Sequence, residues 1–139
     1  MIVGIGVDVV HIPRIRGAIE RWQERFLGRV FTPDELAYAK RRRDPAEHLA
    51  ARFAAKEATL KALGTGLAMG ARWREVEVRR ARGEPPRMAL SGRTAALGAA
   101  RGVRVLHVSL THDGDYAVAQ VLAEGEPGCL IYTSPSPRD

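Results

Sequence analysis

The chain has 139 residues, of which 45% are hydrophobic and 27% charged, and this balance is typical of one soluble globular domain. Lys and Arg number 22 against 16 Asp and Glu, so the net charge of +6 favours an anionic partner. The single cysteine, Cys129, excludes an internal disulfide and a cysteine-based metal site. No apolar run approaches the roughly 20 residues of a membrane helix, and residues 1–8 lack a basic leader, so we expect a cytoplasmic protein without a membrane span.

The N-terminal segment predicts a strand followed by a helix. Residues 2–10 are rich in Val and Ile, as in a buried strand, and its alternation places Gly4, Gly6 and Asp8 on one face. Pro13 suits the first turn of a helix. Its apolar positions are Ile15, Ile19, Trp22 and Phe26, and a neighbouring basic stripe contains Arg14, Arg21 and Arg25.

Two helix start signals follow. Residues 32–35, Thr-Pro-Asp-Glu, have the pattern of a capping box, and residues 44–47 repeat a similar start. The second signal predicts a helix over residues 45–63, ended by Gly64 and Gly66. The apolar side of this helix is expected to contain Leu49, Phe53, Leu60 and Leu63.

The remaining chain predicts strands and one short helix. They are a strand over 74–79, a turn at 83–86, a strand at 88–90, a helix over 92–101 capped by Ser91, strands over 103–110 and 116–122, and a hairpin loop at 111–115. This order predicts an α+β fold in one domain over residues 1–124, with a mostly antiparallel sheet packed with helices. Residues 125–139 lack periodicity, and we interpret them as an irregular tail that need not be native.

Two carboxylates stand out as chemical candidates. Glu57 and Lys61 are four residues apart on one helix face, which by itself is typical of a surface ion pair. Asp8 lies in an apolar strand, where a carboxylate needs a cation or a donor, and pairing with an Arg is the structural alternative. Together Asp8 and Glu57 could hold Mg²⁺, which proteins usually bind through one or two carboxylates and substrate phosphates. Gly4 and Gly6 would leave room for the phosphate.

Three blocks of sequence resemble the signature blocks of the holo-[acyl-carrier-protein] synthase family. The members of this family are phosphopantetheinyl transferases. The three blocks are residues 4–10 with Arg14-Ile15, residues 53–58 with 61–62 and 64–66, and residues 108–112 with 116–117. Their order and spacing match over residues 1–124. The resemblance implies the corresponding fold and transfer of 4'-phosphopantetheine from coenzyme A to a serine of apo acyl carrier protein, in fatty acid biosynthesis.

The resemblance also implies roles for particular residues. Asp8 and Glu57 would bind Mg²⁺ and, with Lys61, form the catalytic group. Lys61 would stabilise phosphate charge, because nearby carboxylates and phosphates oppose its loss of a proton. The general base stays open between Lys61, a metal-bound hydroxide and a water activated by Asp8 or Glu57.

Further implied contacts are with the two substrates and with other subunits. The residues expected at coenzyme A are Arg52, Gly64, Gly66, Ser109, Thr111 and His112, although His112 alone would be interpreted as a solvated loop histidine. The acidic carrier is expected at Arg14, with Arg21 and Arg25 as extrapolations from the same stripe. The family also forms homotrimers with active sites between subunits.

Two other functions compete with this interpretation. A basic nucleic-acid-binding module would explain the net charge, but the chain has only 6% aromatic residues and places carboxylates at the candidate site, so we expect no nucleic acid partner. A transferase for carrier domains of polyketide or other megasynthases is the nearer alternative, and the short chain favours a free carrier.

Overall fold

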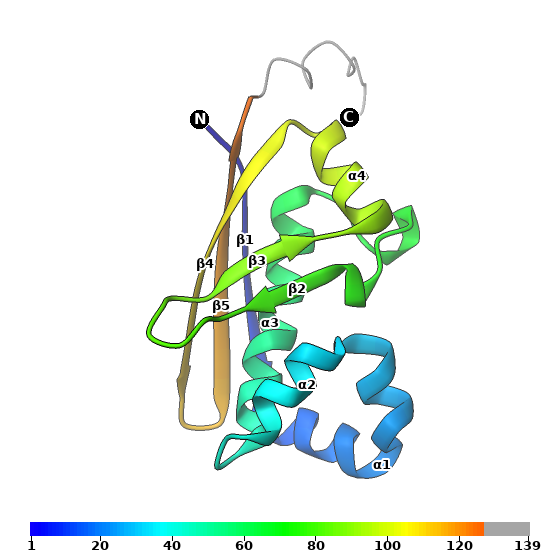
Figure 1. Ribbon diagram of the computed structural model, residues 1–139, viewed down its shortest axis with the longest axis vertical. Helices are drawn as coiled ribbons and strands as arrows, with labels where there is room; N and C mark the ends of the chain where they lie inside the picture. Colours follow the sequence, from blue (N-terminus) through cyan, green and yellow to red (C-terminus); the bar gives the residue numbers. More distant parts are fainter. Residues whose placement is uncertain (127–139) are drawn as a thin grey trace.

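The computed structural model describes residues 1–126, so residues 127–139 of the predicted tail at 125–139 lie outside the described residues. The elements in chain order are β1 (Ile2–His11), α1 (Ile12–Val30), α2 (Pro33–Lys40), α3 (Pro45–Leu63), β2 (Val76–Arg79), β3 (Arg87–Leu90), α4 (Gly92–Ala100), β4 (Val103–Asp113) and β5 (Tyr116–Gly125) (Figure 1). Short 3₁₀ turns at Leu67–Met69 and Trp73–Glu75 precede β2. The predicted α+β fold with antiparallel strands is confirmed.

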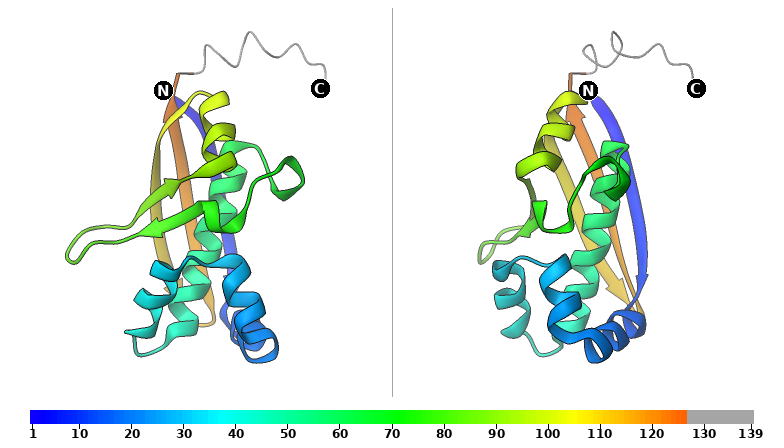
Figure 2. Two further views of the ribbon diagram at one scale, coloured as in Figure 1. Left: turned by 45° about the vertical axis from the view of Figure 1, so that its right-hand side comes forward. Right: turned by 90° about the vertical axis from the view of Figure 1, so that its right-hand side faces the viewer.

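The strands form two antiparallel sheets instead of one. The larger sheet has the order β1-β5-β4, and β2 pairs with β3 in a separate hairpin that projects from the body of the molecule (Figure 2). Gly125 still belongs to β5 and its N–H donates to the carbonyl of Met1, so the sheet ends one residue beyond the predicted boundary. The predicted five-residue hairpin loop is wrong, because β4 continues to Asp113 and the turn consists of Gly114 and Asp115 alone.

Helix α3 is the central element and packs along one face of the larger sheet. Its alanines, including Ala50, Ala54 and Ala58, are fully buried, and they face the equally buried alanines of β5. On β1, a Cβ added at Gly4 or Gly6 would collide with a backbone carbonyl oxygen of α3. These glycines therefore let helix and strand backbones meet, which corrects the expectation that they make room for phosphate.

The helix starts were predicted at the correct residues, but only one uses the predicted cap. Thr32 and Glu35 form the expected capping box, with Thr32 N–H donating to Glu35 Oε1 at 2.9 Å. Asp44 precedes α3 without capping it, and its carboxylate instead accepts two bonds from the Arg16 guanidinium. The predicted cap of α4, Ser91, makes no capping hydrogen bond. The carboxylate of Glu75 takes this role and accepts from the N–H and the hydroxyl of Thr94 in the first turn.

The outer face of the larger sheet is apolar along β1, where the described residues 1–126 leave it uncovered. Cross-strand pairs place Val7 of β1 beside Gln120, and Val9 beside Val118. Ile5, Val7 and Val9 are 60%, 53% and 59% exposed, which is unusual for three branched apolar side chains on one strand. One face of the sheet thus forms the core with α3, and the β1 edge of the other face presents a hydrophobic surface.

Candidate active site

The structure brings Asp8 and Glu57 together. Asp8 lies on the face of β1 that packs against α3, and Glu57 comes from the fourth turn of that helix. Both carboxylates line one pocket of about 320 Å³, together with Arg14. The rings of Phe26 and Phe53 line the same pocket, although sequence patterns assigned them only to the core. The pocket therefore combines two anions and one cation with an apolar wall.

The ionised form of Glu57 is disfavoured in this position. Partial burial, followed by the negative charge of Asp8, raises the pKa of Glu57 above its ordinary value, and Lys61 opposes this shift. A carboxyl group that is disfavoured as an anion gains stability from a nearby cation. This part of the structure is suited to a cation that binds both carboxylates.

Lys61 pairs with Asp8 and not with its helix neighbour Glu57. Its ammonium donates to Asp8 Oδ1 at 3.1 Å and to the carbonyl of Val7 at 3.0 Å. The side chain is 53% exposed, so this pair is accessible to substrate and solvent. Asp8 thus pairs with a lysine. The spacing suggested a surface ion pair between Glu57 and Lys61, but Lys61 contacts Asp8 instead.

The raised pKa of Glu57 predicts a pH-dependent gain in stability for Glu57→Gln. The ionised carboxylate destabilises the fold at pH values above its folded-state pKa, whereas the protonated form carries no such cost below the unfolded value of 4.5. In buffer with a chelator, Glu57→Gln should melt at a higher temperature than the parent at pH 8, and this difference should vanish below about pH 4. Thermal unfolding at both pH values, followed by circular dichroism, measures it. An equal difference at both pH values would contradict the stated cause.

The donor set fits a hard divalent cation that is also held by substrate. Within residues 1–126, no three His, Cys, Asp or Glu side chains converge as a metal-binding group. The protein therefore offers two carboxylates at this place, which is the number that Mg²⁺ commonly takes when phosphates and waters supply the other ligands.

The predicted coenzyme A residues of β4 lie on different faces of the sheet. Thr111 pairs with Val118 and Ser109 pairs with Gln120, so both hydroxyls share the outer face. His112 pairs with Ala117 on the inner face, and its Nε2 lies 3.5 Å from Oε1 of Glu47. Asp8 is on the inner face of the opposite edge strand. A single chain thus does not bring Ser109 and Thr111 to the carboxylates.

The two glycines after α3 have different environments. Gly64 adopts the left-handed conformation with φ 69°, and its N–H and that of Thr65 bond back to α3, which ends the helix as predicted. Gly66 is extended, and a Cβ added there would meet no atom within 4 Å. Gly64 is therefore a helix terminator, whereas Gly66 borders open space.

Arg52 lies in a basic pocket away from the two carboxylates. Its side chain is buried, its guanidinium carbon is 4.0 Å from the centre of the Tyr38 ring, and its Nε has no hydrogen-bond partner. Burial lowers the pKa of Arg52. The pocket has a volume of about 400 Å³, and its other charged lining residues are Asp34, Arg41, Arg79, Arg80 and Arg87.

Arg14, Arg21 and Arg25 are exposed on α1, but the helix is not continuous. Gln23 has φ 44° and ψ −125°, which breaks α1 between Arg21 and Arg25. Arg14 and Arg21 therefore share one regular stretch, and the prediction that all three lie on one unbroken stripe is wrong. Of the three, Arg14 lines the pocket of the carboxylates.

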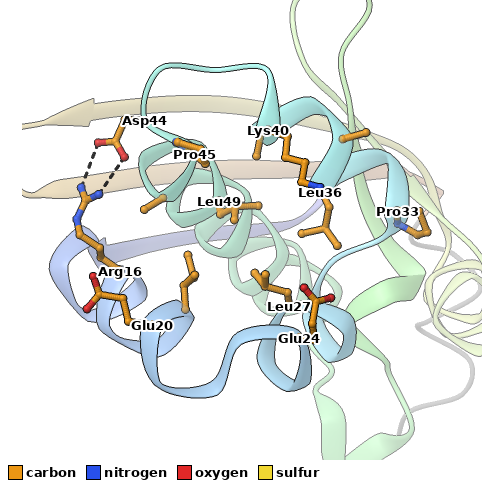
Figure 3. A pocket seen from close by; sticks show the side chains of 14 residues that line it. Arg16, Glu20, Glu24, Leu27, Pro33, Leu36, Lys40, Asp44, Pro45 and Leu49 are labelled. Atoms are coloured by element: carbon orange, nitrogen blue, oxygen red, sulfur yellow. Dashed lines mark hydrogen bonds and ion pairs between the residues drawn. The ribbon is translucent and has the colours of Figure 1, made fainter.

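A larger pocket of about 570 Å³ lies between α1, α2 and α3 (Figure 3). Leu27, Leu36 and Leu49 contribute to its apolar lining, and the Arg16 and Asp44 pair stands at its edge. None of the predicted site residues lines it, so we do not assign it to the candidate site. In residues 1–126, every helix is too short or too polar to cross a membrane.

Comparisons with known proteins identify the class to which this fold belongs. Residues 4–121 match the 4'-phosphopantetheinyl transferase superfamily. The holo-[acyl-carrier-protein] synthase of Koribacter versatilis is 45% identical over 124 residues, which are 89% of this chain and 99% of that protein.

Solved structures of the same enzyme have the same fold. The Neisseria meningitidis holo-[acyl-carrier-protein] synthase superposes with a TM-score of 0.81 at 32% identity, covering 89% of this chain and 99% of that one. The Helicobacter pylori enzyme, solved in complex with coenzyme A, has a TM-score of 0.76 at 29% identity, with 86% and 99% covered. The chain belongs to the holo-[acyl-carrier-protein] synthase family of the 4'-phosphopantetheinyl transferase superfamily.

Proposed function

We propose that this chain transfers 4'-phosphopantetheine from coenzyme A to a serine of apo acyl carrier protein in fatty acid biosynthesis, in a magnesium-dependent reaction. The serine oxygen forms a bond to the phosphorus that carries pantetheine, the pyrophosphate P–O bond breaks, and adenosine 3',5'-bisphosphate leaves. The observation that carries this proposal is the pairing of Asp8 and Glu57 in one pocket, on the fold of this family.

Asp8 and Glu57 would hold Mg²⁺, which when bound neutralises charge on the pyrophosphate of coenzyme A. Lys61 donates to Asp8, and because its side chain is exposed, its ammonium could also contact phosphates held at these carboxylates. We assign it to charge stabilisation, because it already acts as a donor there. The serine proton goes to a base that these contacts do not identify.

The remaining predicted coenzyme A contacts fall into two groups. Arg52 lines a pocket together with four more arginines, which suits a phosphate of coenzyme A. His112 and the hydroxyls of Ser109 and Thr111 are exposed donors on β4, and Gly66 borders open space. Gly64 would shape the site only by ending α3.

The carrier would dock on α1. Acyl carrier proteins are acidic, and Arg14 lines the carboxylate pocket that the serine would enter. Arg21 and Arg25 are exposed on either side of the kink at Gln23, so both remain available to acidic side chains. The cytoplasmic location expected from the sequence stays a prediction.

The proposal also includes a homotrimer with active sites between subunits. The apolar outer face of β1 supports it, because a sheet face with Ile5, Val7 and Val9 exposed is suited to burial against another subunit. Ser109 and Thr111 lie on this outer face, whereas Asp8 lies on the inner face, so the predicted contacts would meet only across an interface.

Charge on the outer face should break the trimer. Analytical ultracentrifugation of the unchanged chain should give three times the 15.2 kDa of one chain, and Ile5→Lys should give a single chain with little transferase activity. Ala96→Lys, a matched change on the exposed side of α4, should keep the trimer and the activity. A monomeric but fully active Ile5→Lys variant would contradict active sites shared between subunits.

The reaction itself is tested by its products. Chain, coenzyme A, Mg²⁺ and apo carrier should together release adenosine 3',5'-bisphosphate, measured by liquid chromatography, and omission of the carrier or addition of a chelator should stop the release. Release without a carrier would indicate hydrolysis of coenzyme A instead of transfer. Release that persists in chelator would contradict the role assigned to the carboxylates.

A further inference from the structure

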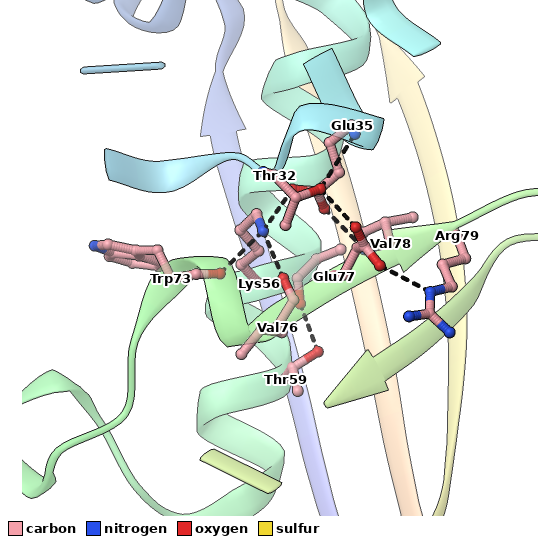
Figure 4. Close-up of polar contacts among 10 residues, drawn as sticks. Thr32, Glu35, Lys56, Thr59, Trp73, Val76, Glu77, Val78 and Arg79 are labelled. Carbon is pink, nitrogen blue, oxygen red and sulfur yellow. Dashed lines mark hydrogen bonds and ion pairs between the residues drawn. The ribbon is translucent and has the colours of Figure 1, made fainter. Parts of the chain in front are cut away.

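Lys56 is the residue before Glu57, and its side chain is completely buried. Its ammonium forms an ion pair with Glu35 Oε1 at 2.8 Å and donates to the carbonyls of Trp73, at 3.0 Å, and Val76 (Figure 4). These three acceptors use all three ammonium protons. A lysine on the central helix is thus bound to residues 17 and 20 positions later in the chain, as well as to α2.

The side chain of Glu35 is also fully buried, and both of its oxygens accept hydrogen bonds. Its Oε1 accepts from the N–H of Thr32, and its Oε2 accepts from the N–H of Val78 at 2.8 Å. The pair therefore joins α3, the start of α2 and the start of β2 through directional bonds. We call this set of contacts, centred on Lys56 and Glu35, the α3 anchor.

The side of α3 that faces the sheet is lined mainly by small residues, whereas Leu49 and Leu60 on its other sides are buried against other elements. The side that packs on the sheet consists of small residues such as Ala54, Ala58 and Ala62, and β5 opposes it with Ala117 and Ala119. Larger side chains interlock and resist sliding, but alanine against alanine or glycine fixes a close distance without fixing rotation. Hydrogen bonds to two particular carbonyls can be satisfied in only one rotation of the helix.

That rotation decides where Glu57 lies. Successive helix residues differ by roughly 100° around the axis, so fixing Lys56 toward β2 fixes Glu57 on the side of Asp8. The two carboxylates repel each other, and this repulsion opposes the placement of Glu57 beside Asp8, although the exposed Lys61 on the same helix pairs with Asp8. The anchor supplies the opposing constraint.

We propose that Lys56, through its ion pair with Glu35 and its bonds to the carbonyls of Trp73 and Val76, is a positioning residue that sets the rotation of α3 and so holds Glu57 beside Asp8. This inference rests on the proposed metal site. Buried ion pairs contribute little net stability compared with apolar packing of the same volume, so geometric specificity is the better reason for one here.

The test compares variants by stability and by metal affinity. Lys56→Met leaves the Glu35 charge buried without a partner and should lower the melting temperature strongly. Lys56→Met/Glu35→Gln removes both charges and should recover much of that loss. The double variant should still bind Mn²⁺ about tenfold more weakly than the unchanged chain, measured by electron paramagnetic resonance with saturating coenzyme A. Its KM for Mg²⁺ should rise while its KM for the carrier stays the same.

Leu49→Ala is the control for stability alone. Leu49 is buried on α3 outside the anchor and the carboxylate pocket, so its truncation should lower the melting temperature but leave Mn²⁺ affinity unchanged. The positioning role is overturned if the double variant binds Mn²⁺ like the unchanged chain, or if Leu49→Ala weakens binding equally. Absence of Mn²⁺ binding by the unchanged chain would instead count against the proposed metal site.

Discussion

Replacement of Glu57 by Gln, or of Asp8 by Asn, is expected to lower the rate of phosphopantetheine transfer at least about 1,000-fold, which corresponds to about 4 kcal/mol of transition-state stabilisation. Both substitutions keep the shape of the side chain and remove the charge that would hold Mg²⁺. Glu57→Gln should gain some stability at neutral pH, because burial and the charge of Asp8 disfavour the ionised Glu57. Asp8→Asn should lose little stability, because its ion pair is with the exposed Lys61. Initial rates with coenzyme A, Mg²⁺ and apo carrier, together with melting temperatures, measure both effects.

Glu126→Gln is the matched control for charge. Glu126 is exposed beyond the end of β5 and belongs to no part of the candidate site, so its neutralisation should leave the rate unchanged. The account of the site would be wrong if Asp8→Asn and Glu57→Gln stayed folded and kept most of the activity. It would lose its support if both variants unfolded, because the carboxylates would then have a structural role.

The second large effect is expected at the contact between β1 and α3. A Cβ at Gly6 would overlap the carbonyl oxygen of Ala58, so Gly6→Ala must push α3 away from the sheet. Overpacking that only a backbone shift can relieve should cost about 3 kcal/mol or more, a large part of the stability of a domain of this size. Urea unfolding measures the loss. Folded Gly6→Ala should also be less active, because the shift separates Glu57 from Asp8.

Gly17 provides the contrasting substitution. It lies on α1 with nothing within 4 Å of an added Cβ and with an ordinary helical backbone. Gly17→Ala should therefore raise the free energy of unfolding by up to about 1 kcal/mol. Equal and small effects at the two positions would show that the close approach of α3 to β1 is not required.

Local signals in the sequence predicted most of the secondary structure and the central pair of carboxylates. The capping box at residues 32–35 and the helix end at Gly64 are formed by hydrogen bonds between residues close in the sequence, so their effects could be predicted without knowledge of the fold. Asp8 and Glu57 could be paired because a charge in an apolar strand and the sequence blocks around both residues pointed to one site.

Contacts between distant residues could not be predicted in this way. The alternation of β1 placed Gly6 and Asp8 on one face, but it did not say that a helix backbone would fill the space beside Gly6. Likewise Glu75 replaces Ser91 as the cap of α4, because tertiary structure brings a carboxylate to its first turn. The kink at Gln23 is a further example, since no proline or glycine at that position announced it.

The burial of Lys56 illustrates the same limit. Sequence patterns assign a lysine to the surface of a helix, and its partners lie 17 to 21 residues away along the chain. Only the folded arrangement shows that this charge is buried and satisfied, and that it stands beside the residue assigned to the metal.

The central claim is the transfer of phosphopantetheine to a carrier serine, and the intact mass of the carrier tests it most directly. After incubation with this chain, coenzyme A and Mg²⁺, apo acyl carrier protein should gain the mass of one phosphopantetheine group, and a carrier whose acceptor serine is replaced by alanine should gain none. An unchanged mass for the intact apo carrier, with folded protein and metal present, would contradict the account.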